Sequence, residues 1–123
     1  MNRRYPPCEL TANGNNAAIE AHVLDDATMR KVGFTDRTER TWYFTRTFRP
    51  YRISFNVAID KATREVAIDV LDEDFLQPYD YQAMLSNDPT CQPALDVERF
   101  VEGQMAYLQD EGVLSGHVRG EYI

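Results

Sequence analysis

The segment from Asp69 to Asp74 carries the most conspicuous cluster of acidic side chains in the sequence, with four carboxylates in six residues. Carboxylate oxygens are the preferred ligands of Mg²⁺ and Ca²⁺ in proteins. Metal-dependent nucleases place such acids on adjacent strands, where the bound ion activates water and stabilises the leaving group. A metal-assisted enzyme that uses Asp69, Asp72 and Asp74 is therefore one hypothesis for this chain.

Two features of the sequence favour a structural role for these acids instead. A nuclease of the acid-acid-lysine type needs a lysine on a neighbouring strand, and the only lysines are Lys31 and Lys61, with Lys61 in a turn far from Asp72. The acid spacing of a calcium-binding loop is also missing. The predicted sheet places residues 72–74 beside Arg49 and Arg52, so we favour mutual charge compensation, while cation binding stays open.

Other catalytic chemistry finds little support in the sequence. His22 and His117 are the only histidines, and neither stands in a recognised motif. A zinc site would have to unite both with Cys8 and Cys91, four isolated residues without one closely spaced pair. No glycine motif that cradles phosphate occurs either. We therefore expect no metal and no cofactor, and a protein that is more readily explained as a non-enzyme.

Three consecutive strands are the strongest structural signal in the sequence. Residues 41–48, 53–60 and 65–71 alternate apolar with polar or small side chains and are rich in β-branched and aromatic types. Their connections are so short that they force antiparallel hairpins. We predict a meander at about 41–71 in which Phe48 pairs with Ile53 and Asp60 pairs with Glu65.

This register predicts two unlike faces of the sheet. One face is apolar and must be the core, although it also carries Arg46, which would pass over Phe55 or pair with a helix carboxylate. The other face has small and polar side chains, and we expect it to be solvated. The predicted core rows are Trp42/Ile59/Val66, Phe44/Val57/Ile68 and Arg46/Phe55/Val70, and the polar rows are Tyr43/Ala58/Ala67, Thr45/Asn56/Asp69 and Thr47/Ser54/Leu71.

Helices are predicted on both sides of the meander. Asp25 can cap a short helix over 25–32 that Gly33 ends, and Leu95-Asp96 repeats this device before a longer helix that ends at Gly112. A brief helical turn is consistent with 81–86, and residues 17–24 fit a strand or a helix equally well. The tail from Val113 to Ile123, which finishes in Tyr122-Ile123, can return to the fold as a short extended segment.

The predicted fold class is therefore α+β: a three- or four-stranded antiparallel sheet, with a short helix before it and a longer C-terminal helix packed on one face. We expect one domain over 17–123, because 123 residues seldom build two cores. An irregular N-terminal arm over 1–16, which contains Pro6, Pro7 and Asn13-Gly14, precedes it.

The distribution of charge is uneven along the chain, whose net charge is −7. Residues 1–64 hold 11 basic and 7 acidic side chains, whereas residues 65–123 hold 2 and 13. An acidic chain whose aromatic residues Trp42, Phe44 and Phe48 belong to the core is not expected to bind nucleic acid. Mimicry of nucleic acid by the acidic half is a weaker alternative.

The compartment is predicted from the absence of apolar segments. No stretch resembles a signal-peptide core or a membrane span, so we expect a cytoplasmic protein without a membrane partner, with Cys8 and Cys91 reduced. This composition is typical of a small accessory or regulatory protein of bacterial or phage type.

Two regions of the chain are candidates for binding a partner protein or a second copy. The first is the polar sheet face, which is unusually poor in Lys and Glu for strand positions facing solvent. The second is the 72–82 loop, with acids, amides and tyrosines on a proline-stiffened backbone. For the tyrosines, recognition and core packing are both open, while Phe75 is expected to cover the core. The candidate residues are Tyr43, Thr45, Asn56, Asp69, Gln77, Tyr79, Asp80 and Tyr81.

Overall fold

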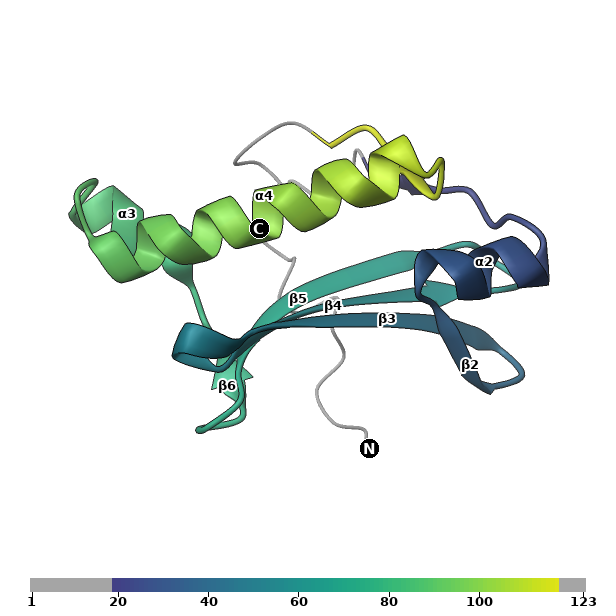
Figure 1. The fold of residues 1–123 in the computed structure, drawn as a ribbon, viewed down its shortest axis with the longest axis horizontal. Helices are drawn as coiled ribbons and strands as arrows, with labels where there is room; N and C mark the ends of the chain where they lie inside the picture. Colours follow the sequence, from purple (N-terminus) through teal and green to yellow (C-terminus); the bar gives the residue numbers. More distant parts are fainter. Residues whose placement is uncertain (1–18, 118–123) are drawn as a thin grey trace.

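A five-stranded antiparallel sheet, in the order β2-β3-β4-β5-β6, carries a layer of helices on one of its faces (Figure 1). The computed structural model describes residues 19–117, so the predicted arm over 1–16 and the terminal Tyr122-Ile123 lie outside the described residues. The α+β class and the C-terminal helix are confirmed. The number of strands is corrected from three or four to five.

The three central strands follow the predicted meander closely. They are β3 (Thr41–Phe48), β4 (Ile53–Asp60) and β5 (Val66–Asp72), and Phe48 pairs with Ile53 while Ile59 pairs with Val66. The backbone N–H of Asp60 donates to the Glu65 carbonyl at 2.9 Å. A 3₁₀ turn, η2 (Arg49–Tyr51), closes the first hairpin, with Arg52 in the left-handed region at φ 53°. Every predicted row across the sheet is confirmed.

The two edge strands were not predicted. β2 (Thr35–Thr38) pairs with β3 through a register irregularity between Thr35 and Thr38, and β6 (Gln77–Pro78) pairs with the end of β5. Both are short and polar, so neither carries an alternation long enough to recognise. β2 nevertheless matters for the candidate site, because it forms one of its walls.

The first helix confirms the prediction for 25–32. In α2 (Asp26–Val32), the Asp25 carboxylate accepts a hydrogen bond from the Thr28 N–H at 3.2 Å, which satisfies an amide that has no partner inside the helix. Gly33 follows at φ 128°, and its N–H bonds back to the carbonyls of Met29 and Arg30. The helix thus ends where the sequence indicated.

The long helix α4 (Gln92–Asp110) begins earlier than predicted. Cys91, not Asp96, is its N-cap residue, and Pro93 lies in the first turn, where a missing N–H costs nothing. A further helix, α3 (Tyr81–Asn87), is longer than the predicted turn, and the Asp80 carboxylate caps it through the Ala83 N–H at 3.0 Å.

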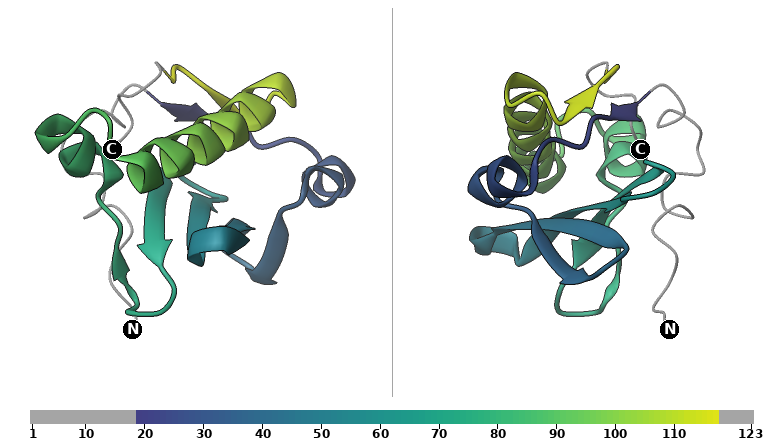
Figure 2. Two further views of the ribbon diagram at one scale, coloured as in Figure 1. Left: turned by 60° about the vertical axis from the view of Figure 1, so that its left-hand side comes forward. Right: turned by 90° about the vertical axis from the view of Figure 1, so that its right-hand side faces the viewer.

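A second, two-stranded sheet joins the ends of the described chain. β1 (Glu20–Ala21) pairs antiparallel with β7 (Leu114–Ser115) beside α4 (Figure 2). This pairing places a short strand, Glu20–Ala21, within residues 17–24, for which the sequence was equally consistent with a helix and a strand. Within the tail from Val113 to Ile123, Leu114–Ser115 is the extended segment that the structure describes, and residues 118–123 lie outside the described part of the chain.

The core lies between the sheet and the helices, on the predicted face. Buried side chains of β3, β4 and β5 meet the inner stripe of α4, and the Tyr107 hydroxyl donates to the Val32 carbonyl at 2.6 Å, which joins α4 to α2. Within residues 19–117, no helix has both the length and the apolar character needed to cross a bilayer. The α4 residues in the core are Ala94, Val97, Val101, Met105 and Leu108.

Candidate functional site

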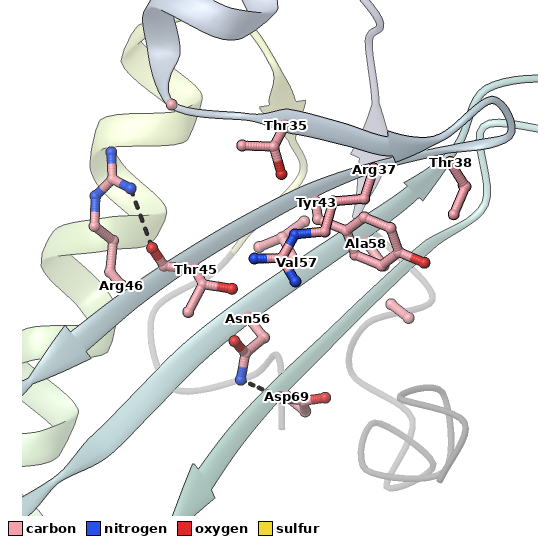
Figure 3. Close-up of a pocket in the computed structure, with 12 residues that line it drawn as sticks. Thr35, Arg37, Thr38, Tyr43, Thr45, Arg46, Asn56, Val57, Ala58 and Asp69 are labelled. Carbon is pink, nitrogen blue, oxygen red and sulfur yellow. Dashed lines mark hydrogen bonds between the residues drawn. The ribbon is translucent and has the colours of Figure 1, made fainter. Parts of the chain in front are cut away.

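The polar face of the sheet, opposite the helices, contains a hollow of about 690 Å³. Strand alternation places Tyr43, Thr45, Asn56 and Asp69 on this face, and all four line the hollow (Figure 3). The structure therefore brings together the four sheet residues that sequence selected. A hollow of this volume lies in the range of pockets that hold small molecules.

A hydrogen-bonded row forms part of the polar face. The Asn56 side-chain amide donates to Asp69 Oδ1 at 2.7 Å and to Ser54 Oγ at 3.0 Å, and the Ser54 hydroxyl donates to the Glu73 carboxylate. Ser54 and Asp69 are only about 1% exposed. The prediction of a solvated face is wrong for these two residues. Their hydrogen bonds offset the cost of burying polar groups.

One wall of the hollow comes from β2 and the turn before it. Gly33, Thr35, Arg37 and Thr38 line this side, and sequence selected none of them. Thr35 and Arg37 are two residues apart, and the pairing of Thr35 with Tyr43 places them on the polar face. That period of two was the available signal, but four polar residues were too few to identify a strand.

Arg46 closes the end of the hollow near Gly33. Its guanidinium lies over the Phe44 ring, 4.2 Å from the centroid, and donates to the carbonyls of Thr45 at 3.1 Å and Val32 at 3.4 Å. The Val32 carbonyl belongs to the last turn of α2, where a cation is favourable. The predicted passage over Phe55 or pairing with a helix carboxylate is thus replaced by a ring and two backbone oxygens.

The acids of the 69–74 segment do not converge. Asp69 lies on the polar face, whereas Asp72 lies on the opposite one, where its carboxylate accepts from the N–H groups of Asp74 at 2.9 Å and Phe75 at 3.2 Å. Asp74 pairs with Arg52 at 2.7 Å, as charge compensation predicts, but Arg49 forms no ion pair within residues 19–117. No group of three His, Cys, Asp or Glu suited to a metal ion occurs in that range.

The two histidines lie apart and contact different neighbours. His22 Nε2 is 2.8 Å from Ser115 Oγ, across the β1–β7 pair. His117 Nε2 is 2.8 Å from Glu102 Oε1, on the side of α4. Cys91 is a free thiol before α4, and Cys8 lies outside the described residues. His22 directly follows β1, and Cys91 is the N-cap residue of α4.

The 72–82 loop is a hairpin followed by the start of α3, and its residues have different surroundings. Phe75 and Leu76, at the tip between β5 and β6, are each 73% exposed, so the prediction that Phe75 covers the core is wrong. Tyr81 is fully buried, so it is not part of the candidate contact surface. Gln77 is exposed, Asp80 caps α3, and half-buried Tyr79 has a raised pKa because burial disfavours the phenolate.

No family model and no curated protein matches this sequence. Its fold is similar to the crystal structure of a DUF1831 family protein from Lactobacillus plantarum, with a TM-score of 0.55. The similarity covers 78% of this chain and 82% of that chain, at 12% sequence identity. At this identity the similarity concerns the fold alone, and the function has to be argued from the residues themselves.

Proposed function

We propose that this chain is a non-catalytic interaction module that binds a partner protein through the β5–β6 hairpin tip, residues 73–76, and the neighbouring polar face. The observation that carries the proposal is the exposure of Phe75 and Leu76, each 73% accessible at adjacent positions. Single exposed apolar residues are common. Aromatic residues such as Phe are enriched at protein interfaces, and a few side chains that fill pockets on the partner supply most of the binding energy.

Hydrogen bonds and one ion pair restrain the backbone of the hairpin tip. The Asp72 carboxylate binds two N–H groups of the turn, the Glu73 N–H donates to the Arg52 carbonyl at 2.9 Å, and Arg52 pairs with Asp74 at 2.7 Å. Leu76 takes a left-handed conformation, φ 53°, which turns the chain into β6. A preorganised loop loses little entropy on binding, so more of its contact energy appears as affinity.

The charges around the tip define the chemistry of the partner. Asp72, Glu73 and Asp74 flank the apolar pair, and Arg52 compensates one of the three. A matching partner surface has an apolar pocket for Phe75 and Leu76 with basic residues on its rim. Complementary charge of this kind raises the association rate and selects against acidic competitors.

The experiment is cross-linked capture on the immobilised full chain from an extract of the native host, followed by direct binding measurements with each purified candidate. The test variant is Phe75→Ser/Leu76→Ser, and the matched control is Met84→Ser, which removes another partly exposed apolar side chain, on α3. We expect specific partners to bind the wild type and the control but to lose at least tenfold in affinity for the test variant, since each anchor contributes about 1 kcal/mol or more.

Two outcomes overturn the proposal. The first is that none of the captured proteins, once purified, binds the wild-type chain in a direct measurement. The second is binding that is equal for the wild type and Phe75→Ser/Leu76→Ser. Light scattering on the purified chain detects self-association, and a dimer that the double variant abolishes identifies a second copy as the partner.

A further inference from the structure

We infer that the hollow on the polar face is a binding site for a small, singly charged carboxylic acid with an apolar body. The hollow measures about 690 Å³ and is lined by β2, β3, β4, β5 and the Gly33 turn. This site lies on the polar face that also belongs to the proposed partner surface, but it does not include the hairpin tip, residues 73–76. Variants of Arg37 and of Phe75 and Leu76 therefore test the two proposals separately.

Arg37 supplies the charge that selects an anion. It extends from β2, lines the hollow and is exposed, and no carboxylate within residues 19–117 lies at ion-pair distance from it. The adjacent Asp36 is engaged on the other side of the strand, where it binds Arg30 at 2.9 Å and Lys61 at 3.5 Å. An uncompensated guanidinium beside a hollow is well suited to a carboxylate, which it can bind through two parallel hydrogen bonds.

Neutral donors lie beside Arg37. The hydroxyls of Thr35, Tyr43 and Thr45 form no hydrogen bond within the described part of the chain, and the three residues line the hollow. Figure 3 shows the Arg37 guanidinium and the Thr45 side chain on the same side of the sheet as the Asn56 amide, with the amide nitrogen turned to Asp69. A carboxylate at Arg37 can therefore accept further hydrogen bonds from hydroxyl groups.

The second arginine of the hollow, Arg46, already contacts other groups of the chain, so it contributes positive charge but no mobile hydrogen-bond donor. Arg46 is fixed by the Phe44 ring and by the carbonyls of Thr45 and Val32. Its positive charge still raises the potential at the Gly33 end of the hollow. A fixed charge costs no reorganisation when a ligand enters.

The charges at the hollow limit the charge of the ligand, and the other residues that line the hollow favour a small apolar group as the rest of the molecule. Of the two arginines that line the hollow within residues 19–117, only Arg37 is available to pair with a carboxylate, and the net charge of −7 disfavours a second negative charge on the ligand. Ala58 and Ala67 offer apolar contact without bulk, whereas the Val57 side chain belongs to the core on the opposite face. Together, these residues favour a monocarboxylate that carries a short alkyl or aryl group over a phosphate or a dicarboxylate.

The test is a titration of the full, ¹⁵N-labelled chain with 3-phenylpropionate, followed by NMR. Its uncharged analogue 3-phenylpropionamide and the doubly charged phenyl phosphate are titrated in parallel. We expect saturable shifts of the β2, β3 and β4 amides around the hollow, with binding about tenfold weaker for both comparison compounds, since a charge-assisted hydrogen bond is worth about one to two factors of ten.

Two variants distinguish recognition by Arg37 from a general charge effect. Arg37→Gln is expected to weaken 3-phenylpropionate binding about tenfold, whereas Arg49→Gln, which removes the same charge from exposed η2, leaves it unchanged. Phe75→Ser/Leu76→Ser also leaves it unchanged. The inference is overturned by an absence of saturable shifts, by equal affinity for the acid and its amide, by tighter binding of phenyl phosphate, or by equal loss in both arginine variants.

Discussion

The hydroxyl of Tyr51 donates a 2.7 Å hydrogen bond to Asp96 Oδ2 and thereby joins the hairpin between β3 and β4 to the beginning of α4. The other oxygen of the same carboxylate accepts from Gln92 Nε2 at 2.7 Å. The hydrogen bond between Tyr51 and Asp96 is the main cause of a pKa shift in each of the two residues. It raises the pKa of Tyr51, because it stabilises the protonated phenol, and it lowers the pKa of Asp96, because it stabilises the carboxylate.

Tyr51→Phe is expected to lower the melting temperature slightly at neutral pH, since both groups lie at the surface. The depressed pKa of Asp96 gives stability that is present above about pH 4 and is lost as pH falls through the folded-state pKa. The raised pKa of Tyr51 gives stability that is present below about pH 10 and is lost as pH rises through the folded-state pKa. The difference between the two proteins should therefore vanish at both extremes.

Thermal unfolding of the wild type and Tyr51→Phe across this pH range measures the effect. Tyr43→Phe is the control, because the Tyr43 hydroxyl forms no hydrogen bond within residues 19–117. A difference between wild type and Tyr51→Phe that persists unchanged in strong acid and alkali would contradict the assignment.

Gly33→Ala is expected to destabilise the fold by about 1–3 kcal/mol, because Gly33 has φ 128° and an added Cβ would lie 2.5 Å from Arg46 Nη2. Gly103→Ala, on the exposed side of α4 with open space around its Cα, should stabilise it by about 0.5–1 kcal/mol. Urea unfolding of the two variants compares them directly. Effects of the same sign would show that the Gly33 turn is not constrained as described.

Asn56→Ala is expected to cost about 1–3 kcal/mol of stability, because it removes an amide donor from buried Asp69 and from buried Ser54. Thr45→Ala, on the same face but exposed, should change stability by less than about 0.5 kcal/mol. Chemical denaturation with an unchanged m-value is the measurement. If Asn56→Ala were as stable as Thr45→Ala, the buried row would have no structural role.

Tyr81→Ala and Phe75→Ser separate packing from recognition in the 72–82 loop. Tyr81 is fully buried, so its truncation should cost about 3–5 kcal/mol. Phe75 is 73% exposed, so Phe75→Ser should leave stability within about 0.5 kcal/mol of wild type. Calorimetry on both variants tests this, and a large loss for Phe75→Ser would mean that its ring packs against the fold in solution.

The meander was predictable in detail because each of its strands alternates over seven or eight residues, and a shift by one residue would expose the core face. The short helix was equally clear, since Asp25 and Gly33 mark both of its ends. These local signals need no knowledge of distant contacts.

The edge strands and the burial of residues in the 72–82 loop could not be predicted, because they depend on contacts between distant parts of the chain. β2 and β6 are polar and short, and they exist because a neighbouring strand already offers free hydrogen-bonding groups. Tyr81 is buried and Phe75 exposed because of the path that the chain takes between β5 and α4. That path depends on packing, so the hollow and its Arg37 wall were visible only in three dimensions.

The pairing of β1 with β7 determines how the fold responds to a mechanical load. Glu20 lies opposite Ser115 and Ala21 lies opposite Leu114, so tension applied between residues 19 and 117 acts first on this two-residue ribbon. Its few hydrogen bonds resist in succession rather than together, and the ribbon should open at low force. The five-stranded sheet, with the hollow and the hairpin tip, would then carry load only after that release.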